Sequence, residues 1–575
     1  MQFLKYVPLL FSIVLFGQKS DKYQTYFEKG NGNQSANYQE IKAYYKLLDS
    51  NFETIKVLEM GETDSGENLQ IVLFDKDKKF NFDKNSKKAV LLINNGIHAG
   101  EPDGIDATMQ LYRDLAVGKI KSPENVILVA IPVYNIGGCL NRNSTIRVNQ
   151  NGPEEYGFRG NARNFDLNRD FIKTDTKNTK SFVAIFQTYN PDIFIDNHVS
   201  NGADYQYTLT YIMTEPKKLG TVLGDFTKNE LTPSILKNLR LKNIETTPYV
   251  NVWKDTPDKG FEQFFDSPRY ATGYTSLFNS IGFVVETHML KKYKDRVKVT
   301  YQFMVETLNY TDRNFKIIKE KRIENLKQYK AGEKYTLKWV IDSTKITKIP
   351  FLGYEGSYKK SDVTTGKRLF YDKLKPYKKE IPFLADYKSV IEIKIPKAYI
   401  IPQGFWTVID LLKLNKIEYS QLLNDTLIEV ESYKIADYKT AKNAYEGHYP
   451  HNTTIVNKSI LKLQFYKGDY LIFTEQKGVK FLLETLEPEA IDSYFNWNFF
   501  DTSLQQKEGY SDYVFEDLAN EYLNKNPDLR VQLQEKIKSD KAFATNPEAQ
   551  LEWVHKNSVY YEKAHLQYPV YRVLK

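Results

Sequence analysis

The sequence predicts a mixed α/β domain followed by a smaller β-rich module and a helical C-terminal region. Up to about residue 330, apolar runs alternate with helical patterns, as in a mixed sheet flanked by helices. Beyond it, short β-like runs are punctuated by proline and glycine. At 575 residues the chain is too long for one hydrophobic core. We therefore expect a large domain at 18–330, a β-rich accessory domain at 331–485, and an aromatic and helical region at 486–575.

The first 17 residues are typical of a secretory signal peptide. They contain Lys5, an apolar stretch at 6–16 and a small residue before Gln18. The alternative interpretation is a buried N-terminal segment. The stretch is too short to anchor the chain in a bilayer and no longer apolar run follows, so we expect no stable membrane insertion. The sequence thus predicts an exported protein, periplasmic or extracellular.

The composition argues against nucleic-acid binding. A formal net charge of +8 is modest for 575 residues, and the lysines are dispersed without an arginine-rich strip. The single cysteine, Cys139, cannot form an internal disulfide, so stability must come from burial of a core. The 42 tyrosines and 34 phenylalanines supply large rings for that core.

Three apolar runs of the first domain predict buried strands, at 126–133, 191–195 and 282–285. Helical patterns cover 103–115, 177–189 and 293–328. Ligands of open α/β sheets bind beyond the carboxyl ends of the strands. The polar residues that follow the strands are therefore the candidates for a functional site.

A metal site is the first candidate. His98 and Glu101 follow another apolar strand and lie three residues apart, so in a helical turn they share a face. His198 comes shortly after the run at 191–195. Two imidazoles and one carboxylate can hold a zinc ion and leave a fourth position open for water or substrate. The sequence therefore predicts one Zn²⁺ on these three residues.

A general base and a group of cations accompany the metal residues. Glu286 directly follows the strand at 282–285, and a carboxylate beside a zinc-bound water can take its proton and pass it to a leaving amine. The polar stretch 159–171 contains three arginines, which suit anionic groups on a substrate.

In these positions the chain resembles the zinc metallocarboxypeptidase family of the carboxypeptidase A type. His98 and Glu101 match the H-x-x-E pair and His198 the distant third ligand, within a matched region of roughly 35–320. The resemblance implies an eight-stranded-type mixed sheet flanked by helices, with 18–330 as the catalytic domain. It also implies the remaining roles: Glu286 as the catalytic glutamate, Arg159 as the oxyanion arginine, Asn168 and Arg169 as the grip on the substrate's terminal carboxylate, and Asp166 as the aspartate that orients the first histidine.

Some assignments keep competitors. Arg163 is an alternative to Arg159 for the oxyanion. The family's mobile tyrosine over the substrate pocket corresponds to Tyr270 or Tyr274, and we favour Tyr270. His288 lies two residues past Glu286, but the family needs no fourth protein ligand.

The expected function is zinc-dependent removal of C-terminal amino acids from a peptide or protein with a free C-terminus. One alternative is a zinc amidase or deacylase acting on cell-wall peptides or acylated amino acids. Another is a non-catalytic peptide- or glycan-binding protein on the same fold. In the C-terminal region, the aromatic run at 494–501 is expected to be core or interdomain contact, with a sugar or peptide platform as the alternative.

Overall fold

The computed structural model describes residues 22–80 and 87–575, so the expected signal peptide lies outside the described part of the chain. Its largest sheet has eight strands in the order β1-β2-β4-β3-β5-β9-β6-β7. The sheet is mixed, because β3, β4, β5 and β9 run parallel at its centre while β1, β2 and β6 pair antiparallel. The predicted fold class is confirmed. The strands are β1 Ile55–Glu62, β2 Asn68–Phe74, β3 Ala89–Asn95, β4 Val126–Ile131, β5 Ile193–Ser200, β6 Leu209–Met213, β7 Thr246–Pro248 and β9 Ile281–His288.

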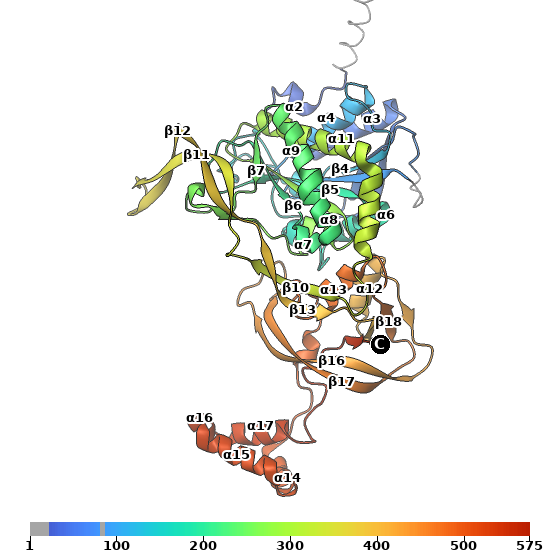
Figure 1. Ribbon diagram of the computed structural model, residues 1–575, viewed down its shortest axis with the longest axis vertical. Coiled ribbons are helices and arrows are strands. Elements are labelled where there is room, and N and C mark those ends of the chain that lie inside the picture. Colours follow the sequence, from blue (N-terminus) through green and yellow to red (C-terminus); the bar gives the residue numbers. More distant parts are fainter. Residues whose placement is uncertain (1–21, 81–86) are drawn as a thin grey trace, which may run out of the picture.

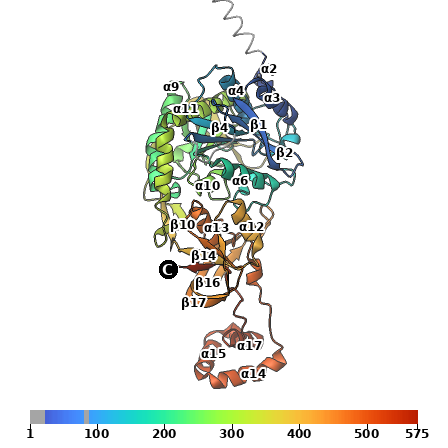
Figure 2. The ribbon, with the colours of Figure 1, turned by 90° about the vertical axis from the view of Figure 1, so that its right-hand side faces the viewer.

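Helices cover both faces of this sheet, with α4 and α11 on one side and α6 and α10 on the other (Figure 2). The three helices predicted from periodicity are present with nearly the predicted ends. Thr176 caps α6 through its side chain, which accepts from the Thr179 amide, and Asn190 ends it in the left-handed conformation. The helices are α2 Tyr26–Lys29, α3 Tyr38–Asn51, α4 Asp103–Ala116, α5 Ile136–Leu140, α6 Lys177–Tyr189, α7 Pro216–Leu219, α8 Thr221–Phe226, α9 Thr232–Leu241, α10 Ala271–Ser276 and α11 Tyr293–Leu326, with short turns η1 Leu167–Arg169, η2 Thr227–Leu231 and η3 Pro257–Lys259.

The central strands are buried along their whole length, which explains their continuous apolar sequence. Two of them are longer than predicted. β5 extends through His198 to Ser200, and β9 extends through Glu286 to His288, so both polar residues lie inside strands rather than beyond them. They are direct neighbours, because His198 pairs with Glu286 in the parallel β5–β9 ladder. The sheet itself therefore holds a metal-ligand candidate beside the base candidate.

After α11 the chain forms β-structure of two kinds. β10 (Lys334–Ile341) pairs with β13 (Tyr387–Lys394), and between them lies a long hairpin of β11 (Thr347–Lys360) and β12 (Lys367–Leu384) that projects from the body (Figure 1). We call this hairpin the arm. Its base joins β8 (Phe261–Glu262) of the first domain, and Phe351 of the arm packs in a separate apolar cluster with Tyr205 and Val252.

A six-stranded sheet follows, in the order β15-β18-β14-β19-β16-β17. The end of the chain returns to it as β19, between β14 and β16. The aromatic run at 494–501 is packed inside this module, with Tyr494, Phe495, Trp497 and Phe500 at most 1% exposed, as expected for core. The remaining elements are β14 Ala398–Ile401, α12 Trp406–Leu414, β15 Ser420–Gln421, β16 Thr426–Thr440, β17 His451–Phe465, β18 Tyr470–Phe473, α13 Val479–Leu486, η4 Asp501–Leu504 and β19 Tyr571–Val573.

Four helices lie apart from the rest, below the six-stranded sheet (Figure 1). They have a small apolar core of their own that includes Phe515, Leu523 and Val554. They are α14 Asp512–Lys525, α15 Pro527–Ser539, α16 Lys541–Ala544 and α17 Pro547–Lys556. Within the described residues, no helix has the length and apolar character needed to cross a membrane. The domain boundaries near 330 and 485 stay predictions.

Candidate metal and catalytic site

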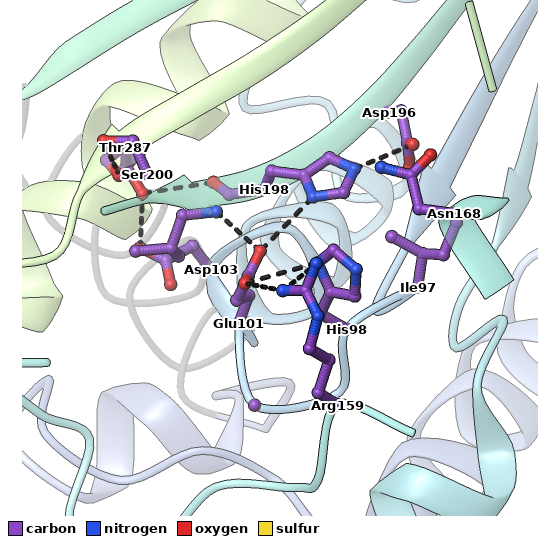
Figure 3. A network of polar contacts seen from close by, with 12 residues as sticks. Ile97, His98, Glu101, Asp103, Arg159, Asn168, Asp196, His198, Ser200 and Thr287 are labelled. Carbon is purple, nitrogen blue, oxygen red and sulfur yellow. Dashed lines mark hydrogen bonds and ion pairs between the residues drawn. The ribbon is translucent and has the colours of Figure 1, made fainter. Parts of the chain in front are cut away.

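The structure brings His98, Glu101 and His198 together at the carboxyl ends of β3 and β5 (Figure 3). His98 and Glu101 lie in the turn between β3 and α4, where the Glu101 amide donates to the His98 carbonyl at 2.8 Å. One oxygen of Glu101 is 3.3 Å from Nδ1 of His98, and the other is 3.3 Å from Nδ1 of His198. The potential ligand atoms lie within 4.8 Å of one another, and all three side chains are buried.

A carboxylate holds the far side of each imidazole. Nε2 of His98 is 3.0 Å from Asp166, and Nε2 of His198 is 2.9 Å from Asp196. Such contacts keep the proton on Nε2 and leave the lone pair of Nδ1 for a metal. The sequence predicted Asp166 beside His98, and the structure places it there. Asp196 has the same position toward His198 and was not singled out.

Asp166 also anchors the neighbouring loop. Its second oxygen accepts from Arg159 at 3.0 and 2.8 Å, and its first accepts from the Asn168 amide at 3.0 Å. Burial alone would raise the pKa of Asp166, but His98 and Arg159 beside it hold that pKa well below its usual range. The carboxylate is therefore charged and fixes both the first imidazole and the arginine.

Glu286 faces the same cavity. Burial raises the pKa of Glu286 to about 8; His198 opposes this shift, and Glu101 adds to it. A carboxyl group with an elevated proton affinity beside a metal site suits a residue that must accept and return a proton.

The cavity has a volume of about 590 Å³ and contains every residue to which the resemblance assigned a metal, catalytic or substrate-binding role. Asn168 and Arg169 lie on one wall with Tyr270, whose ring the Arg169 guanidinium covers at 4.5 Å. Asn168 is also tied to this wall, because its side-chain oxygen accepts from the Ala271 amide at 3.4 Å.

The open alternatives occupy different places. Arg163 stacks on Phe165 at 4.9 Å and does not line the cavity, whereas Arg159 does. Tyr274 is fully buried and donates to Asn415 at 2.7 Å, so Tyr270 is the one of the two tyrosines that lines the cavity. His288 lies against Tyr205, with ring centroids 4.1 Å apart, and contacts Asp204 rather than the metal group.

Arg147, Tyr249 and Asp266 are among the cavity residues that the sequence did not identify. Arg147 donates to Glu101 at 2.9 Å from an irregular loop that has no periodicity to mark it. Tyr249 lies on the wall, and burial raises its pKa. Asp266 is 1% exposed, neither of its carboxylate oxygens has a hydrogen-bond partner, and burial raises its pKa. These three residues are far apart in the sequence, and only the fold brings them to the same cavity.

The accessory module contacts the same wall. The carboxylate of Glu446 accepts from the Asp166 amide at 2.9 Å, which places a residue of the β16–β17 loop directly behind the loop that includes Asn168 and Arg169. Asp492 accepts from the amide of Arg269 at 2.9 Å and from its Nε at 2.7 Å, immediately before Tyr270. The module therefore supports two cavity-lining segments.

A buried His-Glu-His group that could hold a metal ion thus lies in a cavity at the carboxyl edge of a mixed sheet, where ligands of α/β proteins bind. Residues 41–204 match the family described as zinc carboxypeptidase. This part of the chain is therefore similar to a family of peptide hydrolases.

Similarity to individual proteins is distant. Carboxypeptidase 2 of the fungus Trichophyton tonsurans is 21% identical over 427 residues, which cover 71% of this chain and 73% of the relative. Carboxypeptidase 2 of Trichophyton rubrum is 21% identical over 430 residues, with the same coverage. Among solved structures, a metallo-carboxypeptidase from Burkholderia cenocepacia aligns with a TM-score of 0.35 and 13% identity, over 48% of this chain and 70% of that one.

Proposed function

We propose that this protein is a zinc-dependent carboxypeptidase that removes C-terminal amino acids from peptides. The observation that supports it is the convergence in one cavity of the His98, Glu101 and His198 group, the carboxylate of Glu286, and the Asn168–Arg169 wall. The donor set fits zinc, because two imidazole nitrogens and one carboxylate face one point with their outer sides held by Asp166 and Asp196. When bound, zinc supplies a Lewis acid and lowers the pKa of its water.

The residues of the chain divide the remaining work. Asn168 and Arg169 bind the terminal carboxylate of the substrate, since a guanidinium fork matches a carboxylate in two parallel hydrogen bonds. Glu286 accepts a proton from the attacking water and returns it to the nitrogen of the leaving amino acid. Arg159 donates to the oxygen that gains negative charge at the scissile carbonyl. Tyr270 closes the wall beside the terminal residue.

Exopeptidase action follows from the binding of the terminal carboxylate by Asn168 and Arg169. An arginine that holds a free carboxylate a fixed distance from Glu286 selects the last peptide bond. We propose also that the chain is exported, as its N-terminal residues predict, and acts in the periplasm or outside the cell. A peptide or protein with a free C-terminus is its substrate, and one zinc ion is its cofactor.

Mass spectrometry of a peptide mixture incubated with zinc-loaded protein, with and without chelator, tests the proposal. Single residues should leave from free C-termini, and amidated peptides should be spared. Glu286→Gln should abolish turnover and keep zinc bound, because it is no metal ligand in this scheme. Release of acyl groups or cell-wall amides instead would indicate the zinc amidase, and binding without any cleavage would indicate a non-catalytic protein.

A further inference from the structure

The arm concentrates positive charge. Residues 347–384 contain nine lysines and arginines against four acids, which accounts for five of the eight net positive charges of the chain. At its tip, Lys360 lies directly opposite Lys367, and Lys359 directly opposite Arg368. We call these four residues the cationic tip. Like charges directly opposite on paired strands destabilise a sheet, so their position costs folding stability.

No ion pair within the described residues neutralises the cationic tip. The ion pairs of the arm lie nearer its base, between Lys373 and Asp204 at 3.3 Å and between Lys375 and Glu355 at 3.7 Å. All four residues of the tip are exposed. Asp362, in the turn between the two strands, is the one acid at this end of the arm, and Lys359 lies over the Phe370 ring at 3.3 Å. The tip therefore presents a net positive charge to the solvent, in an arrangement that the hairpin alone does not favour.

The arm is seated on the rim of the cavity. Tyr358 donates to the carbonyl of Lys254 at 2.9 Å, and Tyr371 donates to the carbonyl of Asp255 at 2.8 Å. Trp253, the residue before them, lines the cavity and is 54% exposed. The strand that contains Tyr358 and Lys360 is thus held against the loop that directly follows the cavity residue Trp253.

One face of the tip looks toward this rim. Residues two apart on a strand share a face, so Lys360 extends the face on which Tyr358 contacts Lys254. Its cross-strand partner Lys367 lies on the same face. Lys254 itself is exposed and adds a third cation, while the nearby Asp255 is paired with Lys259 at 2.8 Å.

We propose that this surface, formed by Lys254, Lys360 and Lys367, binds an acidic stretch of the polypeptide substrate upstream of the bond that is cut. The inference rests on the proposed carboxypeptidase function and adds a substrate class to it: peptides whose C-terminal region is rich in aspartate and glutamate. Charge complementarity favours such a partner, and the position beside Trp253 favours a chain whose end already lies in the cavity.

Two matched peptides test the proposal. They share their last two residues and differ upstream only in glutamate against glutamine. Each exposed ion pair contributes roughly 1.5- to 5-fold in affinity. Three of them therefore predict that kcat/KM is about 3- to 125-fold higher for the acidic peptide at low salt, mainly through KM. The preference should fall as ionic strength rises.

The variant Lys360→Gln with Lys367→Gln should lose most of this preference and leave hydrolysis of the neutral peptide unchanged. A matched control, Lys348→Gln with Lys378→Gln, removes the same charge from exposed lysines near the base of the arm. This control should retain the preference for the acidic peptide. The thermal midpoint of the tip variant should not fall, because the substitution removes a repulsive pair.

Equal loss of preference in both variants, or no preference in the unaltered protein, would overturn the proposal. If the protein cleaves neither peptide, the proposed function fails and the arm is tested separately. Fluorescence anisotropy of the labelled acidic peptide then measures binding to the tip and control variants. Tighter binding of the glutamate peptide that only the tip variant loses supports the surface, and tip-independent binding contradicts it.

Discussion

Replacement of Asp492 tests whether the accessory module is part of the active site. Asp492 is fully buried and contacts Arg269 through its amide, its Nε and its Nη2, the last at 2.6 Å. Burial alone would lower the pKa of Arg269, yet Asp492 raises it, so the pair is charged. Removing one partner of a buried ion pair costs about 3–5 kcal/mol, because the other charge stays buried without compensation. Asp492→Asn keeps the shape of the side chain, so its loss in the free energy of unfolding should lie near the lower end of this range.

The assay combines stability and kinetics. Urea unfolding followed by tryptophan fluorescence reports on the pair, since the Arg269 guanidinium lies 5.0 Å from the ring of Trp497. We also expect KM to rise more than kcat falls, because Arg269 precedes the cavity residues Tyr270 and Ala271. Asp517→Asn, on the exposed side of α14, is the matched control. Destabilisation below about 1 kcal/mol together with an unchanged KM would refute the reasoning.

Three further predictions concern the cavity. His198→Ala should reduce bound zinc, measured by plasma emission after dialysis, well below one ion per chain; full retention would exclude it as a ligand. Arg159→Lys should lower kcat more than Arg147→Lys, because Arg159 is the proposed oxyanion donor although both arginines lie beside Glu101. A larger loss in Arg147→Lys would transfer the role to Arg147, and two fully active variants would exclude both. Asp266→Asn should stabilise the protein at neutral pH. Folding raises the pKa of Asp266, so the native protein loses stability as pH rises through that pKa and the buried carboxyl group ionises. Urea unfolding at several pH values should show that the gain of the variant vanishes below pH about 4, and a destabilised variant at neutral pH would contradict the prediction.

The metal group could be predicted from the sequence because its parts are local. His98 and Glu101 lie in one turn, and His198 follows an apolar run that marks a central strand. Periodicity also placed the helices around them. The ends of β5 and β9 were harder to predict, because polar residues such as His198 and Glu286 break an apolar pattern while the backbone ladder continues beneath them.

The rest of the site depends on contacts between distant segments. Arg147 lies on a loop without regular structure, and its partner Glu101 is 46 residues away. Glu446 reaches Asp166 across 280 residues. No local pattern records such pairs, since they arise only when the accessory module packs against the catalytic domain. The arm was missed for a similar reason: its lysines are spaced along the sequence, and only the hairpin register sets them opposite one another.

The four-helix segment below the six-stranded sheet leaves and rejoins the body at one point. The Leu566 amide donates to the Ser503 carbonyl at 2.8 Å, so the two connections run side by side before β19 completes the sheet. This geometry is typical of an insertion in an otherwise continuous module. A short glycine-rich bridge between these two residues would therefore excise the helices while the chain end keeps its place in the sheet, and evolution could exchange this segment without rebuilding the enzyme.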